Sequence, residues 1–290
     1  MIGVAWPAVP VRLVVSDIDG TLVGHSKVFT PRTRAAIAAL AERGVGFTVT
    51  TARPPMGLRS IIDLLGLTAP AAAINGGALV RPDLSIIEEK LLSPDMARRA
   101  VTLLRQQGLD PWLFTDRAWY VRDPRGDHVD LETRTIGQAA TVVDEFEPAL
   151  YGRVLKIVGA SKNHPHLADC EALLQHELGA GAIATRSQVY YLDVTSPLAH
   201  KGVAVESLSR AMGVPVAAML TIGDGTNDIP MLTAAGFSVA MGNGSEAVKA
   251  AAHAVTDSVD DDGFAAAIER YVLGDERGVG PPPVLATGTG

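Results

Sequence analysis

The sequence has little cysteine and no long apolar segment, and both shortages exclude classes of protein. Its single cysteine, Cys170, cannot form an intramolecular disulfide, which suits a reducing compartment, so we expect a cytoplasmic protein. No apolar run reaches the roughly 18 to 20 residues that a membrane-spanning helix needs, and we expect no membrane partner. The opening MIGVAWPAVPVR lacks a basic start and contains two prolines, so it predicts a leader or a loose arm rather than a signal peptide.

The chain also lacks an excess of positive charge. Its 25 basic residues against 32 acidic ones give a formal net charge of −7, so we expect no nucleic-acid partner, which would need a concentrated basic surface. An anionic substrate is still compatible, because a metal ion or a few local cations can dominate a pocket. Both ends of the chain lack apolar periodicity, and the C-terminal end is rich in glycine and proline. We therefore expect flexible termini at residues 1–10 and 273–290.

What is present is an alternation of strand and helix patterns, which predicts an α/β fold. Residues 11–82 and 195–272 alternate short apolar runs with amphipathic stretches, as in a doubly wound, mostly parallel sheet with helices on both faces. Residues 83–194 combine paired aromatic and β-branched runs with two amphipathic helices, so they predict an inserted α+β cap domain. The expected core is therefore discontinuous in sequence.

The first part of the core illustrates these local signals. Strands are predicted over residues 11–17, 45–53 and 71–79. A helix is predicted over 30–44, where Thr30 can cap the first turn, Pro31 fits that turn and Gly44 can end the helix.

Small polar side chains follow four of the predicted strands. Since ligands of open α/β sheets bind beyond the carboxyl ends of the strands, these residues should share one rim. They are Asp17 and Asp19 after the first strand, Thr50 and Thr51 after the second, Asn75 after the third, and Asp224 and Asp228 after a late one.

Two acidic motifs stand out on this rim, DIDGT at 17–21 and GDGTNDIPML at 223–232. A calcium loop is excluded for the first, because the glycine and glutamate that it requires are replaced by Leu22 and Val28. The second could merely cap a helix. Four acids on one rim nevertheless predict a hard divalent cation, and oxygen-only ligands suit Mg²⁺.

The motifs SDIDGTL, VTTAR, HKGVAV, GDGTNDIPML and AMGNGSEAVKAAA stand in the order of the four motifs of the haloacid dehalogenase (HAD) superfamily. The chain resembles its Cof-type branch over residues 11 to 272, which implies a Rossmann-like core and a C2-type cap. The resemblance implies an enzyme, a Mg²⁺-dependent phosphoric monoester hydrolase acting on a small phosphorylated metabolite such as a sugar phosphate or a cofactor phosphate.

The resemblance also implies roles for individual residues. Asp17 is the nucleophile that forms an aspartyl-phosphate, activated by Mg²⁺ and Lys201. Asp19 alternates as general acid and general base. The metal ligands are Asp17, the backbone carbonyl of Asp19, and Asp224, while Asp228 acts through a water or by orienting Lys201.

The phosphate-binding residues form a second implied set. The branch commonly has Thr-Gly-Arg where this chain has Thr51-Ala52-Arg53, and the alanine still leaves its amide available. Two roles remain open for Arg53, a substrate contact and a structural ion pair. The full set is Gly20, Thr21, Thr51, Ala52, Arg53, Asn75 and Asn227.

Two other functions remain open at this point. A phosphotransferase or phosphomutase could use the same core and return the phosphoryl group to a second hydroxyl. A catalytically silent sensor of a phosphometabolite is the non-enzyme alternative, although all the acids and Lys201 are intact. The sequence leaves the substrate and the oligomeric state undetermined.

Overall fold

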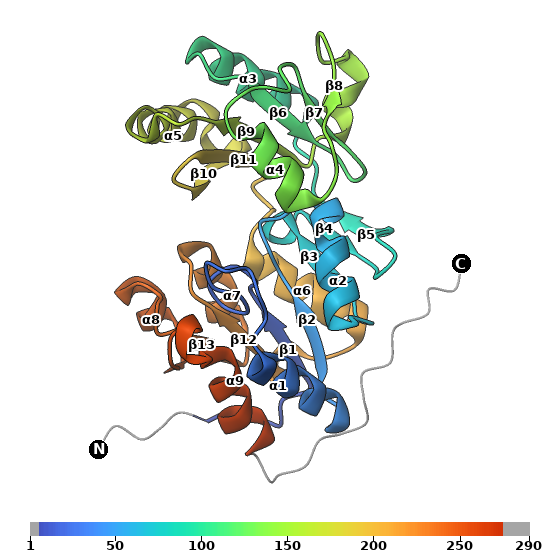
Figure 1. Cartoon of the computed structure of the whole chain (residues 1–290), viewed down its shortest axis with the longest axis vertical. Coiled ribbons are helices and arrows are strands. Elements are labelled where there is room, and N and C mark those ends of the chain that lie inside the picture. Colours follow the sequence, from blue (N-terminus) through green and yellow to red (C-terminus); the bar gives the residue numbers. More distant parts are fainter. Residues whose placement is uncertain (1–5, 275–290) are drawn as a thin grey trace.

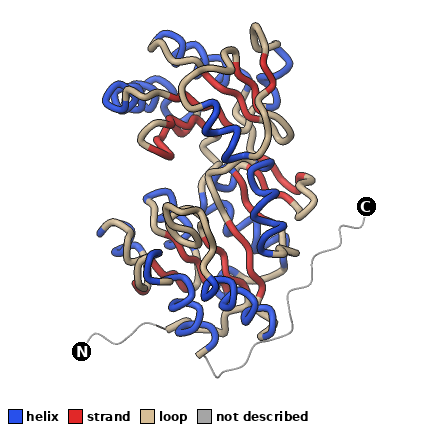
Figure 2. The backbone as a smooth tube through the Cα atoms, in the orientation of Figure 1, coloured by secondary structure: helices blue, strands red, loops and turns tan. Residues whose placement is uncertain are grey.

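A computed structural model describes residues 6–274 of the chain. Figure 1 shows a core built from the two ends of this range and a cap built from its middle, and Figure 2 shows the strands of each part. Most of the predicted flexible termini lie outside the described residues. Trp6, which belongs to the predicted N-terminal arm and is described, packs edge-on against Tyr271 with ring centroids 5.5 Å apart. No helix of residues 6–274 is long and apolar enough to cross a membrane.

The core contains a parallel sheet of five strands. Their order is β14 (Ala254–Val255), β13 (Phe237–Ala240), β12 (Met219–Gly223), β1 (Leu13–Ser16) and β2 (Gly46–Val49). Helices cover both faces: α1 (Pro31–Glu42), α2 (Arg59–Leu65) and α9 (Gly263–Ile268) on one, and α6 (Lys201–Met212), α7 (Ile229–Ala234) and α8 (Glu246–Ala251) on the other.

The alternation of side chains along β1 explains why both faces are covered. Val14 packs into the apolar cluster under α1 and α9, while Leu13 and Val15 pack into the cluster under α6 and α7. All three are fully buried. A strand that is apolar on both sides needs a layer on each side, so the predicted doubly wound α/β core is confirmed.

Helix α1 begins as its sequence predicts. The Thr30 hydroxyl accepts a hydrogen bond from the Thr33 amide at 3.1 Å, and Pro31 occupies the first turn. The chain leaves the helix through Gly44, whose φ of 68° lies in the left-handed region that glycine tolerates.

The short helical turns of the described residues are η1 (Pro55–Leu58), η2 (Ile74–Gly76), η3 (Pro148–Arg153), η4 (Gly179–Gly181), η5 (Val216–Ala218), η6 (Thr226–Asp228), η7 (Val259–Asp261) and η8 (Glu269–Leu273).

The predicted third strand, residues 71–79, is not a single strand. It folds as β3 (Ala71–Ala73), the turn η2 and β4 (Ala78–Val80), which pairs antiparallel with β3 and with β5 (Ile86–Glu89). The left-handed conformations of Ile74 and Asn75 reverse the chain. An isolated bridge from Thr50, the residue after β2, to Ala72 joins this small sheet to the core sheet. Because β5 pairs with β4, we propose that the cap begins after β5 rather than at residue 83.

The cap contains a six-stranded sheet of mostly antiparallel strands. Leu113 and Ile157 face the helices α3 (Pro94–Gln106) and α5 (His164–Leu178), whereas Trp112 and Val158 face α4 (Val129–Ile136) and the core residue Met56. Cys170, a buried residue of α5, packs into the same apolar cluster as Leu113 and Ile157. The strand order is β10 (Ile183–Gln188), β11 (Tyr191–Thr195), β9 (Lys156–Ala160), β6 (Pro111–Phe114), β7 (Trp119–Val121) and β8 (Thr141–Val142).

Candidate active site

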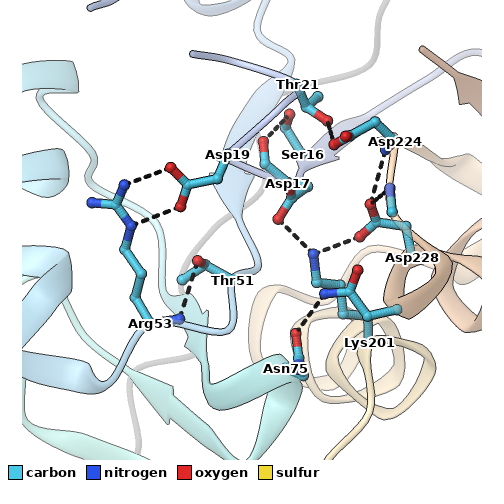
Figure 3. Close-up of polar contacts among 12 residues, drawn as sticks. Ser16, Asp17, Asp19, Thr21, Thr51, Arg53, Asn75, Lys201, Asp224 and Asp228 are labelled. Carbon is cyan, nitrogen blue, oxygen red and sulfur yellow. Dashed lines mark hydrogen bonds and ion pairs between the residues drawn. The ribbon is translucent and has the colours of Figure 1, made fainter. Parts of the chain in front are cut away.

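The polar residues predicted to share a rim lie together at the carboxyl end of the core sheet. Figure 3 shows Asp17, which follows β1, Thr51, which follows β2, and Asp224, which follows β12. Lys201, the first residue of α6, reaches Asp17 and Asp228. One carboxylate oxygen each from Asp17, Asp224 and Asp228 lies within 4.8 Å of the others. The convergence follows from parallel strands, whose carboxyl ends all meet at one edge.

Lys201 is the electrostatic centre of the group. Its Nζ donates to Asp17 Oδ1 and to Asp228 Oδ1, each at 2.5 Å, and its side chain is fully buried. Burial alone would lower the pKa of Lys201, but the two carboxylates outweigh that effect and raise it above its usual range. The ammonium therefore stays charged and holds the two acids at fixed positions.

Asp228 uses both of its carboxylate oxygens within the protein. Oδ1 accepts from Lys201, while Oδ2 accepts the backbone amides of Asp224 at 2.9 Å and Gly225 at 2.8 Å. The residue is completely buried in η6, just ahead of α7. Of its two predicted roles, this geometry supports the orientation of Lys201.

Asp224 is held from the other side of the rim. Its Oδ1 accepts from the Thr21 hydroxyl at 2.9 Å and its Oδ2 from Asn243 Nδ2 at 3.3 Å. Asn243 also donates to the carbonyl of Gly20 at 2.9 Å. Asn243 is not among the predicted site residues, although it lies in the motif AMGNGSEAVKAAA, three residues after the end of β13.

Gly20 is required by this packing. Its φ is 94°, and a Cβ at this position would lie 2.3 Å from Asp224 Oδ2. Any side chain would displace the carboxylate.

The three acids Asp17, Asp224 and Asp228 form a candidate metal centre. Burial raises the pKa of Asp17 to about 8, even though Lys201 opposes the shift, and burial together with the charge of Asp228 raises the pKa of Asp224 to about 6. A cation would offset the cost of these crowded negative charges, and the all-oxygen donor set fits Mg²⁺. The carboxylate of Asp19 lies outside the group, which leaves only its main-chain carbonyl as the predicted ligand.

The Asp19 carboxylate is held by two cations. Arg53 binds it in a bidentate manner, with Nε 2.9 Å from Oδ2 and Nη2 2.7 Å from Oδ1, and Lys27 Nζ lies 2.6 Å from Oδ1. Burial alone would raise the pKa of Asp19, but Arg53 and Lys27 outweigh burial and lower it. In this structure Arg53 thus makes an ion pair, the second of the two roles that the sequence left open. Lys27 carries no motif signal.

The backbone amides differ in detail from the sequence prediction. The amides of Gly20 and Thr21 already donate within their own turn, at 2.8 and 3.4 Å. Among residues 6–274, the amides of Ile18, Asp19 and Ala52 have no hydrogen-bond acceptor. These three amides, rather than those of Gly20 and Thr21, are available to a phosphoryl group.

Asn227, Asn75 and Thr51 complete the rim. Asn227 Nδ2 donates to Asn75 Oδ1 at 3.1 Å, and the Asn75 amide donates to the Thr51 carbonyl at 2.7 Å. The Thr51 hydroxyl accepts the amide of Arg53 at 3.2 Å. The left-handed backbone at Asn75, with φ of 52°, brings its side chain over η6.

A cavity of about 400 Å³ lies over these residues, between the core and the cap. The cap lines it with residues of α4, with Lys156 of β9, with Tyr190 of the turn after β10 and with Tyr191 of β11. Trp112 and Trp119 pack inside the cap instead. The cavity thus opens onto Asp17 and has room for a small organic ligand.

Comparison with known proteins supports one family. The family model for haloacid dehalogenase-like hydrolases matches residues 14–268. The 5-amino-6-(5-phospho-D-ribitylamino)uracil phosphatase YcsE of Bacillus subtilis is 26% identical over 91% of this chain and 97% of its own. The pyridoxal phosphate phosphatase YbhA of Escherichia coli is 28% identical over 86% of this chain and 96% of its own.

The fold comparison agrees with the sequence comparison. The crystal structure of a haloacid dehalogenase-like hydrolase from Bacteroides thetaiotaomicron superposes with a TM-score of 0.81 at 26% identity, over 90% of this chain and 99% of that one. The chain belongs to the haloacid dehalogenase-like hydrolases, in the Cof-type branch.

Proposed function

We propose that this chain is a Mg²⁺-dependent phosphatase that hydrolyses a small phosphorylated metabolite through an aspartyl-phosphate. The observation that carries the proposal is the position of Lys201 Nζ, 2.5 Å from both Asp17 and Asp228. Asp17 and Asp224 in turn have carboxylate oxygens within 4.8 Å of each other, and both residues line the cavity. The named phosphatases among its relatives support the reaction class.

Asp17 is the group placed to attack phosphorus. A phosphomonoester dianion is repelled by a carboxylate, so catalysis depends on positioning and charge neutralisation. Lys201 fixes Oδ1 of Asp17, which leaves the other carboxylate oxygen to form the bond to phosphorus as the bond to the leaving oxygen breaks. The free amides of Ile18, Asp19 and Ala52 stabilise the charge on the transferring oxygens.

The metal site completes the charge balance. Asp17, Asp224 and the Asp19 carbonyl would hold Mg²⁺, and the ion, when bound, neutralises phosphoryl charge and keeps Asp17 ionised. Thr21 and Asn243 orient Asp224 for this role.

Asp19 is the proposed proton carrier. It protonates the leaving oxygen in the first half-reaction and takes a proton from water in the second, when water attacks phosphorus and Asp17 is released. The pair with Arg53 and Lys27 keeps Asp19 ionised, so these cations must move away before it can deliver a proton. An arriving phosphate gives Arg53 another anionic partner.

The first test is turnover of p-nitrophenyl phosphate with and without Mg²⁺. We expect hydrolysis that requires the metal, releases inorganic phosphate and is abolished in Asp17→Asn. Asp63→Asn, which removes an exposed carboxylate on α2, is the matched control and should retain activity. An inactive wild-type protein would instead favour a sensor, and transfer to an added alcohol without phosphate release would favour a phosphotransferase.

A further inference from the structure

The cap wall of the cavity carries a buried ionic cluster that the chemistry at Asp17 does not use. Glu132 of α4 is 6% exposed and lines the cavity together with Lys156 of β9 and Tyr191 of β11. Asp193, also on β11, lies behind them and is 3% exposed. Charged side chains buried this deeply need ion-pair or hydrogen-bond partners.

The ammonium group of Lys156 has three partners within the protein. Its Nζ lies 3.3 Å from Asp193 Oδ2 and 3.3 Å from the carbonyl of Ala52, and it sits 5.0 Å above the centre of the Phe114 ring. The contact with Ala52 ties the cap to the loop whose amide is available to a phosphoryl group. The ammonium is thus committed to Asp193 and to that loop.

Within the described part of the chain, Glu132 consequently forms no ion pair of its own. Two buried carboxylates, Glu132 and Asp193, share one ammonium, and Asp193 Oδ1 has no hydrogen-bond partner within residues 6–274. The Tyr191 hydroxyl, which faces the same cavity, donates to the carbonyl of His128 at 3.5 Å. Burial, together with the charge of Asp193, raises the pKa of Glu132 despite the opposing effect of Lys156. A donor or cation from a ligand would offset this cost.

The neighbouring aromatic side chains shape the same wall. Tyr190 lines the cavity, stacks on His128 with centroids 4.7 Å apart and meets Tyr191 edge-on at 4.6 Å. These rings present flat apolar surface and hydroxyl groups but no positive charge. The cations that line the cavity on the core side, Lys27 and Arg53, are paired with Asp19.

We propose that Glu132 is a specificity-determining residue that selects phosphomonoesters whose organic part carries an amine or another N–H donor, and that it disfavours those with a second anionic group. This inference rests on the proposed phosphatase function and adds the class of its leaving group.

The test compares alkyl monophosphates of equal length that end in an ammonium, a hydroxyl or a carboxylate group, over a short series of chain lengths. The readout is the ratio of kcat/KM for the ammonium substrate to that for the carboxylate substrate, measured within one enzyme preparation. In wild type we expect a ratio of about tenfold or more at the chain length that reaches Glu132, since hydrogen bonds to charged groups discriminate by at least that much.

Three variants complete the design. Glu132→Gln should lower the ratio about tenfold, whereas Glu132→Asp, which keeps the charge, should retain most of it. Asp130→Asn removes an exposed carboxylate from the same helix, where it pairs with Arg134 at 3.0 Å, and should leave the ratio unchanged.

Failure of the two proposals would look different. Wild type that hydrolyses p-nitrophenyl phosphate but prefers the carboxylate substrate, or shows no preference, would overturn the assignment of Glu132 without any variant. A preference that survives in a folded Glu132→Gln protein would do the same. Wild type with no Mg²⁺-dependent hydrolysis of any substrate would overturn the proposed function itself.

Discussion

Replacing the proposed nucleophile should stabilise the metal-free protein, and increasingly so as the pH rises. Asp17 is buried, and its folded-state pKa is raised from 3.8 to about 8. Between these values the folded protein holds a proton that the unfolded chain releases, so this side chain contributes less stability at each higher pH. The amide introduced by Asp17→Asn cannot ionise and escapes that loss, while its oxygen can still accept from Lys201.

The size of the effect follows from the pKa. Each tenfold change in proton affinity is worth about 1.4 kcal/mol, so a rise from 3.8 to about 8 sets an upper limit of roughly 6 kcal/mol. Asp17 titrates together with Lys201 and Asp228, which share the change. We therefore expect the stability of Asp17→Asn relative to wild type to grow by more than about 2 kcal/mol between pH 4 and pH 8.

The assay is urea unfolding of both proteins in a chelator at several pH values. Asp63→Asn, with its exposed carboxylate, should show a constant difference from wild type over the same range. Saturating Mg²⁺ should shrink the advantage of Asp17→Asn, because the ion favours the ionised carboxylate. A difference that stays constant or falls with pH would refute the view that Asp17 is a desolvated carboxylate held at the cost of stability.

Three further substitutions test the contacts that hold the site and helix α1 in place. Lys201→Met should lower the free energy of unfolding in urea by about 3 to 5 kcal/mol, because it leaves buried carboxylates unpaired. Adding Asp228→Asn should recover part of this loss, and no recovery would argue against charge as its cause. Gly20→Ala should raise the Mg²⁺ concentration needed for half-maximal turnover about tenfold or more by displacing Asp224, and an unchanged requirement would contradict this. Thr30→Ala should cost about 1 kcal/mol by removing the cap of α1, whereas Thr30→Ser should not.

Much of the fold could be predicted because its signals are local. Thr30 and Gly44 mark the ends of α1, and the apolar run of β1 needs only its own residues to indicate a strand buried on both faces. The prediction of a single strand over residues 71–79 was wrong, although the sequence interrupts the apolar residues with Asn75, Gly76 and Gly77. Asn-Gly is a local turn signal, and the left-handed backbone at Asn75 and Gly76 reverses the chain between β3 and β4.

The candidate site shows the same division. Asp17, Lys201, Asp224 and Asp228 could be named from motifs, because each is fixed at a strand end or helix start by its own flanking residues. Asn243 and Glu132 could not, since each gains its role from groups far away in sequence. Lys27 is only eight residues from Asp19, but no motif indicates that the two side chains pair.

The sequence by itself determined the alternation of strands and helices, the rim of acids and the family. Tertiary structure alone decided which amides remain available, that Arg53 and Lys27 hold Asp19, and which cap residues line the cavity. The reason is physical: secondary structure and strand-end position depend on neighbours along the chain, whereas burial, pairing and pKa depend on neighbours in space.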